Sequence, residues 1–175
     1  TSRQVYVYRY ISHLIDSVIP GKYPSLRDVG GKPAIAYYDD TNDDLKYARA
    51  ITASPSNSDQ WRVHSVDTTG DVGHQPSLVV LADGNPAMAY LDKTNGWLKF
   101  ARSDTTIPDY PINWSIHAVV TTNAATLWED ISCQVCRGYP VISYYDTVAN
   151  ELKFARSTLE IPTATGDWAT HAVDS

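Results

Sequence analysis

Short runs of apolar and aromatic residues, separated by turn residues, recur along the 175-residue chain. One stretch, residues 76–103, reads PSLVVL, the turn ADGN, PAMAYLD, the turn KTNG and then WLKFARS. No stretch keeps the 3.6-residue spacing of an amphipathic helix. Because short β-rich runs alternate with turn residues, the pattern predicts an all-β chain.

The same sequence unit occurs three times. Residues 33–49 read PAIAYYDDTNDDLKYAR, residues 86–102 read PAMAYLDKTNGWLKFAR, and residues 140–156 read PVISYYDTVANELKFAR, so the copies begin 53 and 54 residues apart. A second block follows each copy: WRVHSVD at 61–67, WSIHAVV at 114–120 and WATHAVD at 168–174. A period of about 50 residues is typical of repeat folds.

Each repeat contains four predicted strands; we call the first the inner strand, the second the central strand and the fourth the outer strand. Both faces of the central strand carry apolar or aromatic residues. A four-stranded antiparallel sheet covered on both faces and repeated in tandem is the blade of a β-propeller. We therefore predict an all-β, propeller-like array of three blades, at residues 20–67, 68–120 and 121–175. Residues 1–19 contain YISHLID, which matches the outer-strand block, and are predicted to form half a blade or exchanged strands.

The run YYDxTNxxLKYAR, followed by WxxHxVD, resembles the tandem propeller repeats of secreted bacterial proteins. The resemblance covers nearly the whole chain and implies a propeller fold and a secreted or cell-surface location. It does not specify a function, because propellers of this kind include lectins, adhesins, enzyme appendages and structural modules.

The number of strands predicts association with other copies of the chain. Three blades and a half blade fall short of the four blades that a closed ring needs. The exposed end faces carry no polar cap, and such faces make heterologous contacts that lead to rings or filaments. The candidate segment for strand exchange contains Val5, Tyr6, Val7, Tyr8 and Tyr10.

Composition excludes two classes of partner. The chain carries 14 Lys and Arg against 20 Asp and Glu and has no basic run, which argues against a nucleic-acid partner. No segment approaches the roughly 18 consecutive apolar residues of a membrane span, so we expect no membrane insertion.

The repeated polar residues favour structural roles. His13, His64, His117 and His171 occupy one position of the repeat. Equivalent positions on successive blades lie too far apart to converge on one metal ion, so we predict hydrogen bonds between strands or blades and no metal site. The repeated acids Asp39, Asp92 and Asp146 are predicted to hold hairpin backbones or ion pairs, and no catalytic residue or cofactor is predicted.

The two cysteines, Cys133 and Cys136, align with an inner strand. Residues three apart on a strand lie about 10 Å apart on opposite faces, beyond the reach of a disulfide. We predict that both are buried free thiols.

Positions that differ between the repeats are the candidates for ligand binding. Tyr23, His74 and Trp128 lie in the loops that lead into the inner strands, and Trp97 lies at a hairpin. Exposed aromatic rings are natural platforms for a sugar or a partner surface.

These observations lead to a prediction of a non-enzymatic extracellular protein whose incomplete propeller assembles with neighbouring copies into a fibre, ring or surface layer. The first alternative is a lectin-like module that binds glycans through the aromatic residues above. A further alternative is the accessory propeller of a larger secreted enzyme.

Overall fold

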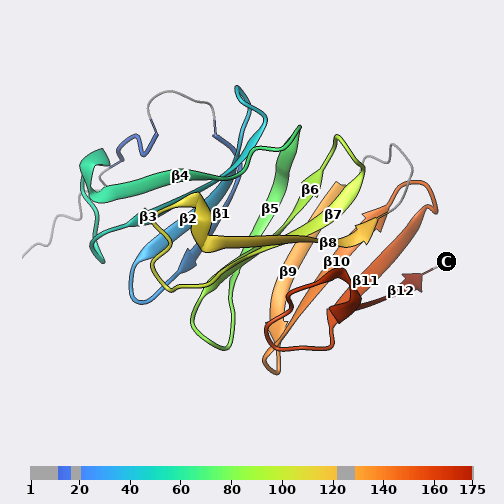
Figure 1. Cartoon of the computed structure of the whole chain (residues 1–175). Helices are drawn as coiled ribbons and strands as arrows, with labels where there is room; N and C mark the ends of the chain where they lie inside the picture. The colour runs from blue at the N-terminus through green and yellow to red at the C-terminus, as the bar shows by residue number, and fades with distance from the viewer. Residues whose placement is uncertain (1–11, 17–20, 122–128, 175) are drawn as a thin grey trace, which may run out of the picture.

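Three four-stranded antiparallel sheets form a propeller-like array in the computed structural model, which describes residues 12–16, 21–121 and 129–174. Figure 1 shows them in chain order from blue to red. Blade 1 contains β1 (Gly21–Asp28), β2 (Pro33–Asp39), β3 (Asp44–Ala50) and β4 (Trp61–Asp67). Blade 2 contains β5 (Val72–Val80), β6 (Pro86–Asp92), β7 (Trp97–Ser103) and β8 (Trp114–Thr121). Blade 3 contains β9 (Glu129–Cys136), β10 (Tyr139–Asp146), β11 (Glu151–Ser157) and β12 (Trp168–Asp174).

A one-turn 3₁₀ helix precedes the outer strand of each blade. These turns are η1 (Ser58–Gln60), η2 (Pro111–Asn113) and η3 (Thr165–Asp167). The outer strand then begins at Trp61, Trp114 or Trp168. No helix in the described part of the chain is long and apolar enough to span a bilayer. The prediction of an all-β chain with four-stranded blades is therefore confirmed.

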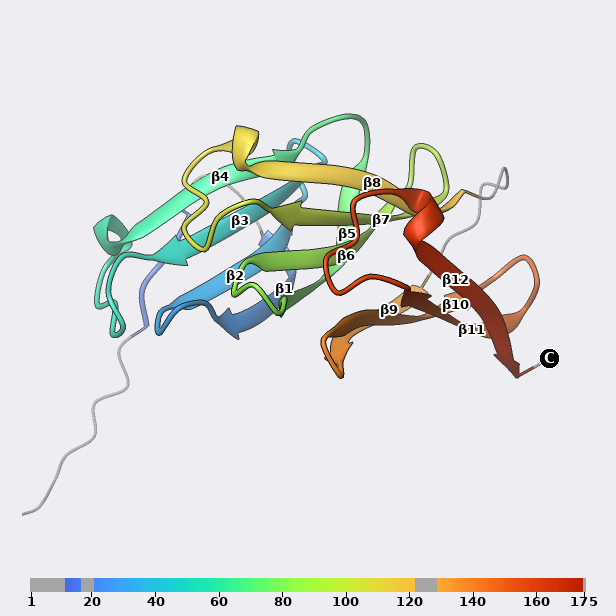
Figure 2. The ribbon, with the colours of Figure 1, turned by 60° about the horizontal axis from the view of Figure 1, so that its bottom comes forward.

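The inner strands β1, β5 and β9 lie next to one another, and serine side chains join them. Ser25 Oγ accepts a hydrogen bond from the backbone N–H of Leu78 at 3.0 Å. Ser77 Oγ accepts the equivalent bond from Cys133 at 2.9 Å. Figure 2 shows the sheets turned relative to one another as they follow along the array. This arrangement places the starts of all three inner strands at the same end of the blades. We call it the bulge end, because each inner strand has a β-bulge there.

The repeated acid at the end of each central strand holds the hairpin that follows. Asp39 Oδ1 accepts backbone hydrogen bonds from Thr41 and Asn42, at 3.0 and 3.2 Å. Asp92 accepts from Asn95 N at 2.9 Å, and Asp146 does the same for its own hairpin. Short carboxylates commonly bind backbone groups two or three residues ahead in this way. The prediction of a structural role for these acids is confirmed.

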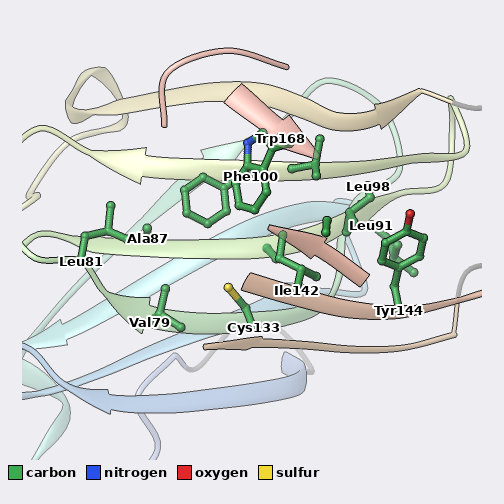
Figure 3. Close-up of a cluster of buried hydrophobic side chains, with 13 residues drawn as sticks. Val79, Leu81, Ala87, Leu91, Leu98, Phe100, Cys133, Ile142, Tyr144 and Trp168 are labelled. Atoms are coloured by element: carbon green, nitrogen blue, oxygen red, sulfur yellow. The ribbon is translucent and has the colours of Figure 1, made fainter. Parts of the chain in front are cut away.

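Apolar side chains fill the space between successive blades. Figure 3 shows the cluster between blades 2 and 3, where Phe100 of β7 and Trp168 of β12 meet near Ile142 and Cys133. The rings of Phe100 and Trp168 make an edge contact with centroids 5.2 Å apart. Burial of such rings dominates the energetics of a core, so the blades stabilise one another through these faces.

Each outer-strand tryptophan also donates a hydrogen bond to the histidine of the preceding sequence repeat. Trp114 Nε1 donates to His64 Nε2 at 2.9 Å, and Trp168 Nε1 donates to His117 Nε2 at 3.0 Å. Trp61 does the same to His13, at 3.1 Å. The prediction of hydrogen-bonded histidines is confirmed for His13, His64 and His117. We call each such pair a Trp–His contact.

The acidic residue near the end of the outer strand is replaced by valine in blade 2. Asp67, at the end of β4, accepts hydrogen bonds from Tyr90 Oη at 2.7 Å and Lys99 Nζ at 2.6 Å. Val120 occupies the matching position of β8, since it pairs with Leu98 as Asp67 pairs with Leu45. The lysine of blade 3 pairs instead with the acids of its own hairpin, Asp146 and Glu151, at 2.6 and 3.4 Å.

One expectation from the sequence is wrong, and another concerns residues that the structure does not describe. Cys133 is buried and Cys136 is exposed, and both are free thiols, so the prediction that both are buried was wrong. Cys136 occupies the place of Leu81 in blade 2, which blade 3 covers, whereas no described residue covers Cys136 in that way. The proposed exchange segment with Val5, Tyr6, Val7, Tyr8 and Tyr10 lies outside the described residues.

Candidate functional site

Each inner strand carries a β-bulge near its start. In β1 the pairing changes between Lys22 and Ser25, so two residues on the inner strand oppose one on the central strand. Equivalent shifts occur in β5 and β9. At each bulge a residue other than glycine adopts a left-handed backbone: Tyr23 (φ 53°), Gln75 (φ 49°) and Asp130 (φ 56°).

This backbone conformation is energetically unfavourable for a tyrosine or a glutamine. A left-handed residue other than glycine costs about 1–3 kcal/mol, and such residues gather at functional sites. Bulges also redirect side chains and are frequent next to active sites. Here the three bulged residues differ in chemistry, offering a phenol ring, a carboxamide and a carboxyl group. This distinguishes them from the structural residues that the repeats share.

The bulged residues surround a hollow of ≈ 380 Å³ at the bulge end. Its lining consists of Tyr23, Pro24, Gln75, Pro76, Asp130, Ile131 and Ser132. Gln75 Oε1 accepts a hydrogen bond from the backbone N–H of Ile131 at 3.3 Å, so blade 2 is joined to blade 3 across the hollow. Because the oxygen of this amide is used, its NH₂ group is the part that can donate to a ligand. A concave site with a few convergent polar groups is typical of small-molecule binding.

An aromatic cluster lies beside the hollow, where blade 1 meets blade 2. The ring of His74 stacks on that of Tyr38 with centroids 3.8 Å apart. Tyr23 contacts both, with its ring centroid 6.5 Å from Tyr38 and 6.2 Å from His74. Tyr23, which is 47% exposed, therefore stands on a buried aromatic base and belongs to both the hollow and the cluster.

Two carboxylates hold the polar atoms of this cluster. Asp71 Oδ1 lies 2.5 Å from His74 Nε2. Tyr38 Oη is 2.6 Å from Asp43 Oδ1 and 3.0 Å from Asp71 Oδ1. Burial lowers the pKa of His74, although Asp71 opposes the shift. Burial, together with hydrogen bonds to Asp43 and Asp71, raises the pKa of Tyr38, so the phenol stays protonated and donates.

The loop that carries Asp71 is fixed on both sides. The backbone N–H of Asp71 donates to Thr94 Oγ1 at 2.7 Å, and the carbonyl oxygen of Asp71 accepts from Lys93 N at 2.8 Å. The next residue, Val72, donates its N–H to the carbonyl of Asp43 in blade 1 at 2.9 Å. Gly73 follows with φ 96°, and a Cβ there would lie 2.5 Å from the Cα of Leu45. These contacts hold the loop that leads into β5 against blade 1.

The structure brings two of the predicted ligand-binding residues together and places Trp97 apart from them. Tyr23 and His74 are neighbours in the cluster. Trp97 is half-buried at the start of β7, paired with Asp92, and does not line the hollow. Trp128 lies outside the described residues. Whether any of these four residues binds a ligand stays a prediction.

Sequence reasoning missed Asp130. Comparing the loops by sequence placed Trp128 opposite Lys22 and His74, and Glu129 opposite Tyr23 and Gln75. The sheet register instead places Asp130 there, because Ser132 pairs with Ser143 as Ser77 pairs with Ala89. The signal was present in KYPS, HQPS and EDIS, which align on their serines.

Among the described residues, no group of three or more His, Cys, Asp or Glu side chains could hold a metal ion. The acidic hairpin at 39–44 instead uses Asp39 for its own backbone and Asp43 for Tyr38. The chemistry available at the bulge end is therefore that of an aromatic ring, an amide, a hydroxyl and carboxylates.

Comparison with solved structures finds similar folds in several glycoside hydrolases. No protein-family model and no curated protein matches the sequence. A GH43 glycoside hydrolase engineered to display endo-xylanase and exo-arabinofuranosidase activity aligns over 90% of this chain and 30% of its own, with TM-score 0.53 and 13% identity. An α-L-arabinofuranosidase from Lactobacillus brevis aligns over 84% and 51%, with TM-score 0.55 and 14% identity. A bifunctional GH43-CE protein of Bacteroides eggerthii aligns over 89% and 20%, with TM-score 0.56 and 15% identity.

The chain spans about half or less of the length of these structures. At such low identity the likeness establishes the propeller fold. The named neighbours are glycoside hydrolases, a finding that contradicts our prediction of a non-enzymatic protein that assembles with its own copies. That prediction was wrong, because it inferred a function from the number of blades alone.

Proposed function

We propose that this chain is part of a carbohydrate-active propeller that binds an oligosaccharide at the bulge end and hydrolyses a glycosidic bond there. The observation that carries the proposal is the hollow bordered by Tyr23, Gln75 and Asp130, three unlike side chains on strained bulges of successive blades. The glycoside hydrolase neighbours support the reaction class. A glycan partner and a secreted location, both expected from the sequence, fit this proposal.

Each bordering side chain has a separate role. Tyr23 offers its exposed ring to the apolar face of a sugar. Gln75 donates its amide hydrogens to sugar hydroxyls, and Asp130 supplies a carboxyl group. Glycosidases use a pair of carboxyl groups, one on each side of the scissile bond. Asp130 is the acid among the lining residues, and Asp71 is a second carboxylate at the same end of the blades.

Arabinoxylan oligosaccharides are the first substrates to test, because the neighbours act on arabinofuranosides and xylan. Calorimetry would measure binding, and release of reducing sugar would measure hydrolysis. We expect Asp130→Asn to keep binding and to lower the rate by about 10²-fold or more, since positioned acid–base groups contribute about 10²–10⁴-fold. Asparagine tolerates the left-handed backbone at this position, so the bulge is kept.

A second variant tests binding. Tyr23→Asn removes the ring and is expected to weaken binding about tenfold, with little change in the unfolding midpoint. Asp59→Asn, in the exposed turn η1 away from the bulge end, is the matched control and should change neither quantity. Binding without hydrolysis would disprove the enzymatic part of the proposal, and absence of binding would disprove it entirely.

A further inference from the structure

The outer face of blade 3, meaning the face turned away from blade 2, exposes side chains that are buried elsewhere in the array. In blade 2, Leu98 is 0% and Val119 is 4% exposed. The matching residues of blade 3, Leu152 and Val173, are 44% and 58% exposed. The register confirms the match, since Leu152 pairs with Asp174 as Leu98 pairs with Val120. The outer face is therefore apolar and without cover among the described residues.

This face also carries the receiving half of a Trp–His contact. In blade 2 the rings of Phe100 and His117, 5.8 Å apart, receive Trp168 of blade 3. In blade 3 the rings of Phe154 and His171 lie 5.3 Å apart in the same pair of strands. Phe154 borders a hollow of ≈ 300 Å³ that is open at this face. The geometry is that of a site for an indole ring whose N–H donates to His171.

The inner strand of blade 3, β9, also carries a serine at the position that joins the other inner strands. Ser25 and Ser77 each accept a backbone N–H from the next inner strand. Ser132 occupies the same register position on β9, and its side chain is exposed. A neighbouring strand with a free backbone N–H would complete the same bond.

We propose that the outer face of blade 3 is the docking surface of one further four-stranded blade, which packs a tryptophan against both Phe154 and His171 and bonds its inner strand to Ser132. This proposal is independent of the hydrolytic function. Two boundaries within the chain, from blade 1 to blade 2 and from blade 2 to blade 3, use the same three contacts.

A second copy of this chain does not provide the required group. The outer-strand tryptophans Trp61, Trp114 and Trp168 already donate to His13, His64 and His117. Releasing one of them would leave a half-buried histidine acceptor without its donor, which is unfavourable. The occupant is therefore a blade that brings its own outer-strand tryptophan.

The test extends the full chain after Ser175 with a second copy of residues 68–121. In a repeat array, stability increases with each nearest-neighbour interface. We expect the midpoint of thermal unfolding to rise by about 4 °C or more, and the amides of β11 and β12 to exchange more slowly. The His171→Ala variant of the extended chain should lose most of this gain, whereas the same substitution in the unextended chain, where His171 is exposed, should change little.

Three results would overturn the proposal. The first is an extended chain with no increase in midpoint or protection. The second is an appended blade whose own amides stay unprotected, because the same sequence is structured in blade 2. The third is concentration-dependent doubling of the mass of the unextended chain by light scattering, with protection of the outer face, which would make a second copy the occupant.

Discussion

Nε2 of His64 accepts a hydrogen bond from Nε1 of Trp114 across the boundary between blades 1 and 2, at 2.9 Å. The accepting nitrogen carries no hydrogen, so the imidazole is neutral with its hydrogen on Nδ1, a buried atom that has no hydrogen-bond partner. The contact joins two sheets that share no strand. It therefore contributes to the attachment of one blade to the next.

Removing this acceptor should destabilise the protein. His64→Ala leaves the buried indole N–H without a partner and removes a ring that packs on Tyr47, so we expect the free energy of unfolding to fall by about 1–3 kcal/mol. Urea unfolding followed by circular dichroism would measure it. His171→Ala, at the exposed equivalent position, should change the value by less than about 0.5 kcal/mol. Equal effects of the two substitutions would disprove the role of the contact.

The same histidines make stability dependent on pH. Burial lowers the pKa values of His64 and His117 in the folded protein. The unfolded chain binds these protons near pH 6.5, so it binds more protons than the folded chain below that pH. The stabilisation is complete above about pH 6.5 and is lost as the pH falls toward the lower pKa values of the folded state.

Urea unfolding at pH 7.5 and pH 5.5, at constant ionic strength, would measure this effect. The folded pKa values of Asp39 and Asp146 are lowered, so their own contribution is lost near pH 4 and below, outside this interval. Replacing both histidines by glutamine, which accepts a hydrogen bond and does not titrate, should reduce the difference between the two pH values. A protein as stable at pH 5.5 as at pH 7.5 would contradict the assignment.

Gly73 is required by the loop that leads into blade 2. Gly73→Ala would place a Cβ 2.5 Å from the Cα of Leu45 in a backbone with φ 96°. Gly31→Ala is the matched control, because Gly31 has φ 76° and nothing lies within 4 Å of its Cβ position. We expect the control to cost about 1 kcal/mol, the backbone term alone, and Gly73→Ala to cost several times more. Thermal unfolding of both variants would decide, and similar midpoints would refute the close approach.

The two thiols should differ in reactivity. Burial raises the pKa of Cys133 to about 12, whereas Cys136 is exposed. Because the thiolate is the nucleophile, iodoacetamide should alkylate Cys136 alone in the native protein at pH 8. Mass spectrometry would show one added group, absent from the Cys136→Ser variant. Addition of denaturant should expose Cys133 and restore one added group in that variant, and native alkylation of Cys133 would contradict its burial.

Local and repeated features of this fold were predictable. Asp39 and its hairpin lie within a few residues of one another, so their relationship is visible in the sequence. The Trp–His contacts join distant residues, yet their recurrence at one position of each repeat indicated a structural role. The bulge end was not predictable in the same way, because Tyr23, Gln75 and Asp130 approach one another only when three inner strands lie side by side.

The amino-acid sequence by itself determined the all-β class, the four strands of each blade and the structural use of the repeated His and Asp residues, since strand and turn preferences act over a few residues and the repeat multiplies each signal. Only the tertiary structure decided the rest. The one-residue shift that each bulge introduces placed Asp130 beside Gln75, and the stacking of blades buried Leu81 but left Cys136 exposed. Both depend on which sheet faces lie next to one another, a property of the whole array and not of any segment.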